Sequence, residues 1–194
     1  MSSITDDTKS NIPNNENFVE MKRNSKNEDL IDDNTKLNHK LNSLISINLL
    51  HIISKNKLKG NYKALLKKQK NNIFNIQKIP KLSIGDFLYR ITYYIKVSEE
   101  ILISSLILME RFCIKNNIIL TLYNIHRLLF ISIMVNIKFM EDDKFLNSFY
   151  AMICDVKLSY LNKMEYEFLC GIQFQLFINK KTYYKYQNLL LSQE

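Results

Sequence analysis

Glycine, proline, cysteine and tryptophan are all scarce in this chain of 194 residues, which has 3 glycines, 2 prolines, 3 cysteines and no tryptophan. A β-sandwich, a phosphate-binding loop and a dinucleotide fingerprint all need glycine at tight turns, so this composition argues against them. The chain is nevertheless 46% hydrophobic and can bury one core. We therefore predict an all-helical protein.

The three cysteines, Cys113, Cys154 and Cys170, are far apart and form no C-x-x-C pair, and no apolar leader follows Met1. We expect a reducing compartment, no disulfide framework, no metal site and no cofactor. No Cys/His pair, serine elbow or carboxylate dyad stands out, so the residues favour neither an enzyme nor a small-molecule substrate.

The net charge of +8 comes from one stretch of the chain. Residues 1–35 carry 8 acids and 4 bases, residues 36–81 carry 11 lysines and no acid, and residues 82–194 carry 12 bases and 11 acids. We interpret the basic stretch first as a solvated face with an import role for Lys55–Lys59 or for the group at Lys63, Lys67, Lys68 and Lys70. Salt-sensitive contact with nucleic acid and docking of an acidic or phosphorylated partner are the alternatives. Nucleic acid is disfavoured because the stretch has no arginine and few aromatic residues.

Apolar residues recur at helical spacing through most of the chain, except in residues 1–34, which are polar and are expected to be disordered. The predicted helices are 36–54, a short lysine-rich helix after Gly60, 84–96, 99–116, 122–140, 144–154, 159–173 and 180–191. Ser83 and Ser98 are expected to cap the helices that follow them. The helix over 122–140 is apolar on nearly every side, so we place it at the centre of a bundle. Its polar interruptions argue against a membrane span, and no membrane partner is expected.

Several segments, in this order and spacing, resemble the cyclin box, and within it the P-type cyclins, the phosphate-regulon-like group of yeasts and protists. The segments are Ile79–Ile84 with Phe87–Ile91, Ser98–Glu100 with Met109–Phe112, Thr121–Leu129 with Asn136–Asp142, Asn147–Ala151, and Leu161–Glu165 with Phe168, Leu169 and Phe174. The resemblance covers about residues 74–178. The abundance of Asn, Lys and Ile is typical of an AT-rich genome, and we expect an apicomplexan source.

The resemblance implies a single five-helix cyclin box at 79–178. A disordered tail at 1–34 and a basic helical segment at 35–78 precede the box, and a C-terminal helix at 179–194 follows it. It further implies a non-catalytic regulatory subunit that binds a cyclin-dependent kinase and activates it by holding the kinase helix C in the active position. The expected role is in cell-cycle progression and division, in the nucleus and cytoplasm. The alternative is a cyclin-fold scaffold for nucleic acid or transcription that uses residues 36–81.

The residues that match the family's kinase-binding positions are Lys138 and Glu165. By position, the apolar surface around them is expected to include Phe139, Leu146, Phe149 and Tyr150. A plainer interpretation competes in each case, because a cation at a helix C-terminus and an acid on a helix surface are common without any partner. His126 lies in an apolar helix and is expected to be structural. Where the group usually has a glycine pair, this chain has Cys154 and Asp155, and we expect Asp155 to take a left-handed conformation.

Overall fold

The structure is a computed structural model that describes the backbone of residues 33–142 and 145–192 and, within these ranges, the side chains from His39 onward. Every regular element in these ranges is a helix, which confirms the predicted all-helical fold class. In chain order the helices are α2 (Asp33–Lys57), α3 (Tyr62–Gln69), α4 (Ile84–Ile95), α5 (Glu99–Lys115), α6 (Ile125–Met140), α7 (Asn147–Cys154), α8 (Leu158–Gly171) and α9 (Lys180–Leu191). The predicted disordered tail lies outside the described residues, except that its last two residues begin α2.

Side-chain N-caps that the sequence predicts set the starts of two helices, α4 and α5. The Ser83 hydroxyl accepts a hydrogen bond from the Asp86 amide at 3.0 Å, and the Ser98 hydroxyl accepts one from the Ile101 amide at 3.4 Å. Both predicted N-caps are therefore confirmed. Helix α6 starts three residues later than predicted, because the Asn124 side chain closes a turn by accepting from the Thr121 amide at 2.9 Å.

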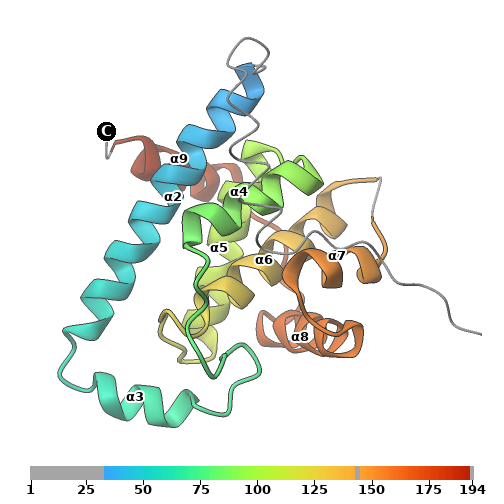
Figure 1. Cartoon of the computed structure of the whole chain (residues 1–194). Coiled ribbons are helices and arrows are strands. Elements are labelled where there is room, and N and C mark those ends of the chain that lie inside the picture. The colour runs from blue at the N-terminus through green and yellow to red at the C-terminus, as the bar shows by residue number, and fades with distance from the viewer. Residues whose placement is uncertain (1–32, 143–144, 193–194) are drawn as a thin grey trace, which may run out of the picture.

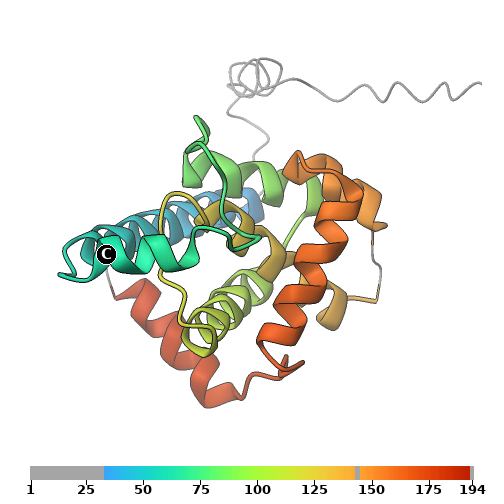
Figure 2. The same ribbon diagram turned by 90° about the horizontal axis from the view of Figure 1, so that it is seen from below.

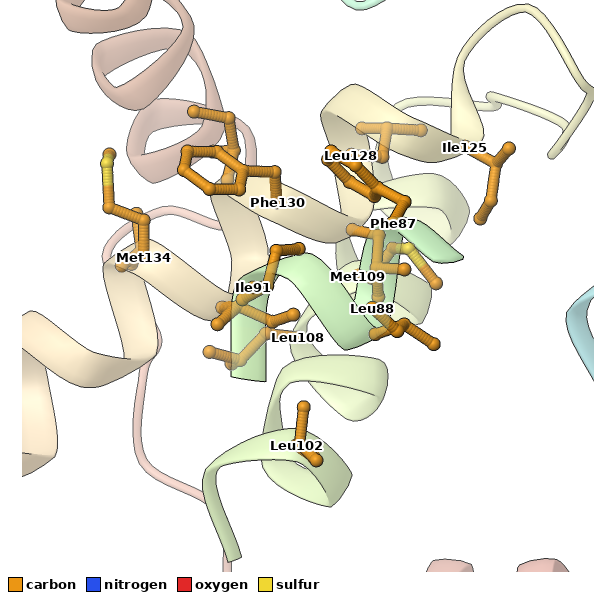
Figure 3. Close-up of a cluster of buried hydrophobic side chains, with 14 of the residues drawn as sticks. Phe87, Leu88, Ile91, Leu102, Leu108, Met109, Ile125, Leu128, Phe130 and Met134 are labelled. Atoms are coloured by element: carbon orange, nitrogen blue, oxygen red, sulfur yellow. The ribbon is translucent and has the colours of Figure 1, made fainter. Parts of the chain in front are cut away.

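Helix α6 lies in the middle of the bundle, as its sequence predicts. From Ile125 to Ile137 every side chain except that of Arg127 is buried. Figure 3 shows how residues of α4, α5 and α6 form one cluster of buried hydrophobic side chains, with Phe87, Leu108 and Phe130 among its members. Burying a large apolar side chain contributes about 1.5–3 kcal/mol, so this cluster is the main source of stability.

The remaining helices cover this centre from two sides, as Figures 1 and 2 show: α2 and α9 lie on one side, and α7 and α8 lie on the other. Four α2 residues at helical spacing, Leu41, Ile45, Leu49 and Ile53, are buried in the same core, although α2 belongs to the predicted basic segment. Helix α3 projects from the end of α2. Among the described residues, no helix is both long enough and apolar enough to cross a bilayer.

Two buried polar side chains of α6, Asn136 and His126, are hydrogen-bonded to backbone. Asn136 donates to the Ile101 carbonyl at 3.1 Å. The His126 Nε2 lies 3.0 Å from the Leu82 carbonyl, and its ring packs edge-to-face on Phe87 at 5.1 Å. Asp155 takes the left-handed conformation (φ 54°, ψ 51°) at the end of α7, as expected where a glycine is usual.

Replacing His126 with glutamine is expected to reduce the pH dependence of stability. Burial lowers the pKa of His126 below its ordinary value of 6.5, and the hydrogen bond to the Leu82 carbonyl opposes this shift only in part. The unfolded chain therefore binds a proton at this residue more readily than the folded chain. The contribution of His126 to the free energy of unfolding is fully present above pH 6.5 and declines as the pH falls below that value. One such group contributes at most about 1.4 kcal/mol per pH unit. Urea unfolding at pH 7.5 and 5.5 measures the effect.

The matched control for this experiment is His51→Gln, because His51 is exposed on α2. It is expected to leave the pH dependence of wild type in place. An identical fall in unfolding free energy between the two pH values for wild type and His126→Gln would contradict the prediction.

Candidate functional site

Three polar side chains from three helices meet at one end of α6. The Lys138 Nζ lies 2.5 Å from the Glu165 Oε1, and the Asn147 Nδ2 donates to the Glu165 Oε2 at 2.9 Å. Asn147 also donates to the Asn162 Oδ1 at 2.8 Å. We call Lys138, Glu165 and Asn147 the polar triad. It fixes α6, α7 and α8 relative to one another.

Each member of the polar triad owes its place to a helix. Lys138 lies in the last turn of α6, where the helix dipole favours a cation. Asn147 is the first residue of α7, and Glu165 lies midway along α8. The Lys138 and Glu165 side chains keep 25% and 16% of their surface exposed, so both remain open to a partner.

An apolar surface borders the polar triad. Phe139 follows Lys138 and is 52% exposed, and Leu146 precedes Asn147 and is 78% exposed. Phe149 is half-buried and packs on exposed Phe145 with ring centroids 4.4 Å apart. Soluble proteins seldom leave such side chains together in water unless a partner covers them.

Tyr150 is the exception among the residues expected on this surface. Its side chain is fully buried, and its ring packs edge-to-face on Phe130 at 6.4 Å. The expectation that it contributes surface is wrong, because Tyr150 lies on the face of α7 that packs on the core, together with Ala151 and Ile153. Tyr150 supports the apolar surface from beneath.

A depression of about 450 Å³ adjoins the apolar surface, since Phe139 is part of its lining. Its remaining lining comes from the segment between α8 and α9, with Phe174, Gln175, Leu176 and Phe177, and from Arg111 of α5. Phe174 and Phe177 are 62% and 76% exposed. The sequence predicts no place in the site for these residues. The one sign of them in the sequence is that two phenylalanines, Phe174 and Phe177, follow directly after the predicted helix 159–173.

Arg111 holds the segment in this shape. Its guanidinium donates to the carbonyls of Gln175 and Phe177, the latter at 3.3 Å. These contacts tie α5 to the segment between α8 and α9. Phe174 itself has a positive φ of 54°, which is costly for an aromatic residue and turns the chain at this point.

The predicted basic group lies elsewhere. Lys63, Lys67, Lys68 and Lys70 are exposed on α3 and its C-terminal cap, and Figures 1 and 2 place α3 on the side of the molecule opposite α7. The structure therefore does not bring these lysines to the polar triad.

Chemistry-bearing side chains do not gather elsewhere in the described part of the chain. No group of three or more His, Cys, Asp or Glu residues in these ranges could hold a metal ion. Burial raises the pKa of the Cys113 and Cys154 thiols to about 12, which leaves both as unreactive thiols at neutral pH. The arrangement at the polar triad is suited to binding rather than to chemistry.

Comparison with known proteins agrees with this architecture. The sequence model of the family named Cyclin matches residues 17–176. Cyclin-U2-2 of Arabidopsis thaliana is 34% identical over 118 residues, which cover 60% of this chain and 51% of that protein. Cyclin-P3-1 of Oryza sativa subsp. japonica is 32% identical over 119 residues, which cover 61% of this chain and 50% of that protein.

A yeast protein is similar as well. PHO85 cyclin-7 of Saccharomyces cerevisiae is 29% identical over 126 residues, which cover 59% of this chain and 44% of that protein. The chain thus spans about half the length of the curated relatives it matches. U-type, P-type and PHO85-type relatives agree with the predicted resemblance, whereas the apicomplexan source stays a prediction. Because the family match covers most of the chain and the described residues form a helical bundle, the chain belongs to the cyclin family.

Proposed function

We propose that this chain is a regulatory subunit that binds a cyclin-dependent kinase and activates it. Cyclins are regulatory subunits, and two yeast relatives, PHO85 cyclin-7 and PHO85 cyclin-like protein psl1, carry the name of PHO85. We extend the proposal to a role in cell-cycle progression and division, in the nucleus and cytoplasm.

The observation that carries the proposal is the juxtaposition of an oriented ion pair with an uncovered apolar surface. Lys138 has ammonium donors beyond the one directed at Glu165, and Glu165 has lone pairs left after it accepts from Lys138 and Asn147. These groups can bind backbone carbonyls and amides near the end of a partner helix. Phe139, Leu146 and Phe149 then cover the apolar face of that helix.

The physical basis of activation is positioning. In protein kinases the ion pair between a lysine of strand three and a glutamate of helix C must be in place for catalysis. A rigid surface on the cyclin favours the kinase conformation in which helix C contributes its glutamate. The polar triad suits this task because three packed helices, rather than loops, hold its members.

Replacement of Leu146 by aspartate tests the proposal, because it places a charge in the apolar surface without disturbing the core. Tagged wild type and Leu146→Asp are purified from the source cells, and each eluate is assayed by mass spectrometry and for histone kinase activity. We expect the variant to retain at most about a tenth of the co-purified kinase and of the activity, since it buries an unpaired charge.

Ile47→Asp is the matched control, because Ile47 is 63% exposed on α2, outside the site. It should retain wild-type kinase and activity. The proposal is overturned by full kinase recovery with Leu146→Asp, by equal losses in both variants, or by wild-type eluates without any protein kinase.

A further inference from the structure

The basic stretch forms a second exposed surface that the proposed function leaves unused. We call it the lysine knob, and it runs from the end of α2 through the turn at 58–61 to the end of α3. Its members are all exposed and comprise Lys55, Lys57, Lys59, Lys63, Lys67, Lys68 and Lys70. No acidic residue occurs in the sequence between Asn34 and Gly85, and none of the seven lysines forms an ion pair with a residue of the described ranges. Among the residues that the structure describes, the positive charge of the knob is therefore uncompensated.

Buried polar contacts hold the lysine knob in one conformation. The Asn56 amide donates to the Leu120 carbonyl at 3.1 Å. The Gln69 side chain donates to the Ile119 carbonyl at 3.2 Å and accepts from the Ile119 amide at 3.1 Å. For an import receptor to bind these lysines as an extended segment, α3 would have to unwind and Gln69 would have to leave these hydrogen bonds. The folded knob is thus built as a surface rather than as a linear import signal.

The lysine knob and the polar triad lie far apart. Figures 1 and 2 place α3 on one side of the bundle and α7 on the other. A partner seated on the knob leaves the proposed kinase-binding surface free, so this inference does not rest on the proposed function.

We propose that the lysine knob docks a flexible acidic segment of a partner protein, in which carboxylates stand at alternate residues of an extended chain. Along α3, Lys63, Lys67 and Lys70 lie on one face, and the cap at Lys70 keeps helical backbone angles. Lys63 and Lys67 are four residues apart and so about 6 Å apart along the helix axis, and Lys67 and Lys70 are three residues apart and so about 4.5 Å apart. Alternate residues of an extended strand are about 6.6 Å apart. This spacing is close to that of Lys63 and Lys67, and the long, flexible side chain of Lys70 can reach the next carboxylate.

The shape and chemistry of the knob favour a flexible peptide over other anions. Lys55 and Lys57 flank buried Asn56 and therefore leave α2 on opposite sides, about 200° apart around the helix. A planar bilayer reaches only one of these sides, whereas a flexible chain follows both. Single-stranded nucleic acid is flexible as well, but its tight binding relies on aromatic stacking, and the knob's one aromatic residue, Tyr62, is half-buried.

Leu58 adds a further feature. It is 86% exposed at the turn between Lys57 and Lys59. Because exposed Leu58 is surrounded by lysines, it suits a peptide segment that carries one apolar side chain among its acidic residues. A phosphate backbone offers no such group.

The test measures peptide binding by fluorescence anisotropy with the full chain at low salt. The probe is a labelled 13-residue peptide with glutamate at alternate positions and one leucine. The combined variant Lys63→Gln, Lys67→Gln, Lys70→Gln is expected to bind about tenfold more weakly, since it loses three exposed ion pairs. Leu58→Ser is expected to bind about threefold to fivefold more weakly, because less apolar area is covered.

A control of equal charge separates the knob from net charge. The variant Lys157→Gln, Lys180→Gln, Lys181→Gln removes three exposed lysines outside the knob and is expected to bind within about twofold of wild type. Thermal unfolding confirms that each variant is folded.

Three outcomes overturn the proposal: an equal loss of binding in the control variant, undiminished binding by the knob variant, or tighter binding of oligothymidylate or of phosphatidylserine vesicles than of the peptide. Kinase capture by the knob variant should equal that of wild type, so a failure here is distinguishable from a failure of the proposed function.

Discussion

Exchanging the two charged members of the polar triad, in the variant Lys138→Glu, Glu165→Lys, is expected to weaken kinase binding at least about a hundredfold while the chain stays folded. The two side chains lie 2.5 Å apart, so the exchange rebuilds the same ion pair with reversed polarity. A hydrogen bond to a charged group contributes about 1.5–3 kcal/mol, and the partner loses two of them. A loss of about 3 kcal/mol corresponds to a factor of about one hundred in Kd.

The structural cost of the exchange is smaller than its effect on binding. A glutamate at position 138 opposes the dipole at the C-terminus of α6, which costs about 0.3–1 kcal/mol. The Asn147 amide also loses its carboxylate acceptor, at a cost of about 1 kcal/mol. We expect urea unfolding to show a decrease of about 1–2 kcal/mol. Titration with the purified kinase gives the change in Kd.

The single variant Lys138→Glu is the comparison that assigns the role of the pair. It places two carboxylates together and should be less stable than the exchanged pair, with equally poor binding. If the ion pair serves only to join α6 to α8, the exchanged pair should instead restore kinase binding close to wild type. That result would remove Lys138 and Glu165 from the proposed binding surface.

Replacing Arg127 with leucine is expected to lower the free energy of unfolding by about 2–3 kcal/mol. The Arg127 guanidinium donates to the Ile73 and Asn75 carbonyls at 3.1 and 2.8 Å and to the Tyr160 hydroxyl at 2.9 Å. It also stacks over the Tyr160 ring, 4.8 Å from the centroid. These bonds join the segment before α4 to α6 and α8, and their loss leaves backbone carbonyls without donors. Urea unfolding at pH 7.5 measures the change.

Tyr160→Phe is the matched variant for this cluster. It keeps the ring under Arg127 but removes the hydroxyl that donates to the Ile73 carbonyl at 2.6 Å, at an expected cost of about 1 kcal/mol. The effects of the two substitutions should not add, because both residues serve the same carbonyl. A loss below 0.5 kcal/mol for Arg127→Leu would place it among ordinary surface arginines.

Local chemistry accounts for the parts of the fold that the sequence predicts well. Ser83 and Ser98 begin their helices because a hydroxyl satisfies an amide that the first turn leaves unpaired. Helix α6 is central because it is apolar on nearly all sides, and no position at the edge of a bundle could bury it. Helix α6 begins at Ile125 rather than at residue 122 because the turn at Asn124 depends on a side-chain hydrogen bond that periodicity does not reveal.

Part of the candidate site can likewise be predicted from the sequence, and part depends on how the helices pack. The family resemblance selects Lys138 and Glu165 from the sequence, but periodicity alone leaves each as an ordinary helix charge. Their pairing across 27 residues and the contact of Asn147 with Glu165 depend on the packing of three helices. Burial of Tyr150 beside half-buried Phe149 depends on the rotation of α7 against the core.

The sequence by itself determined the helical class, the order of the helices, the central place of α6 and the basic character of residues 36–81. These properties depend on composition and on contacts within about four residues, which the order of residues specifies directly. Only the tertiary structure decided that the polar triad exists, that Arg111 shapes the segment at 174–177, and that the lysine knob faces away from the proposed kinase-binding surface. These features depend on contacts between residues distant in the chain, and helix packing sets such contacts through the fit of whole side-chain surfaces.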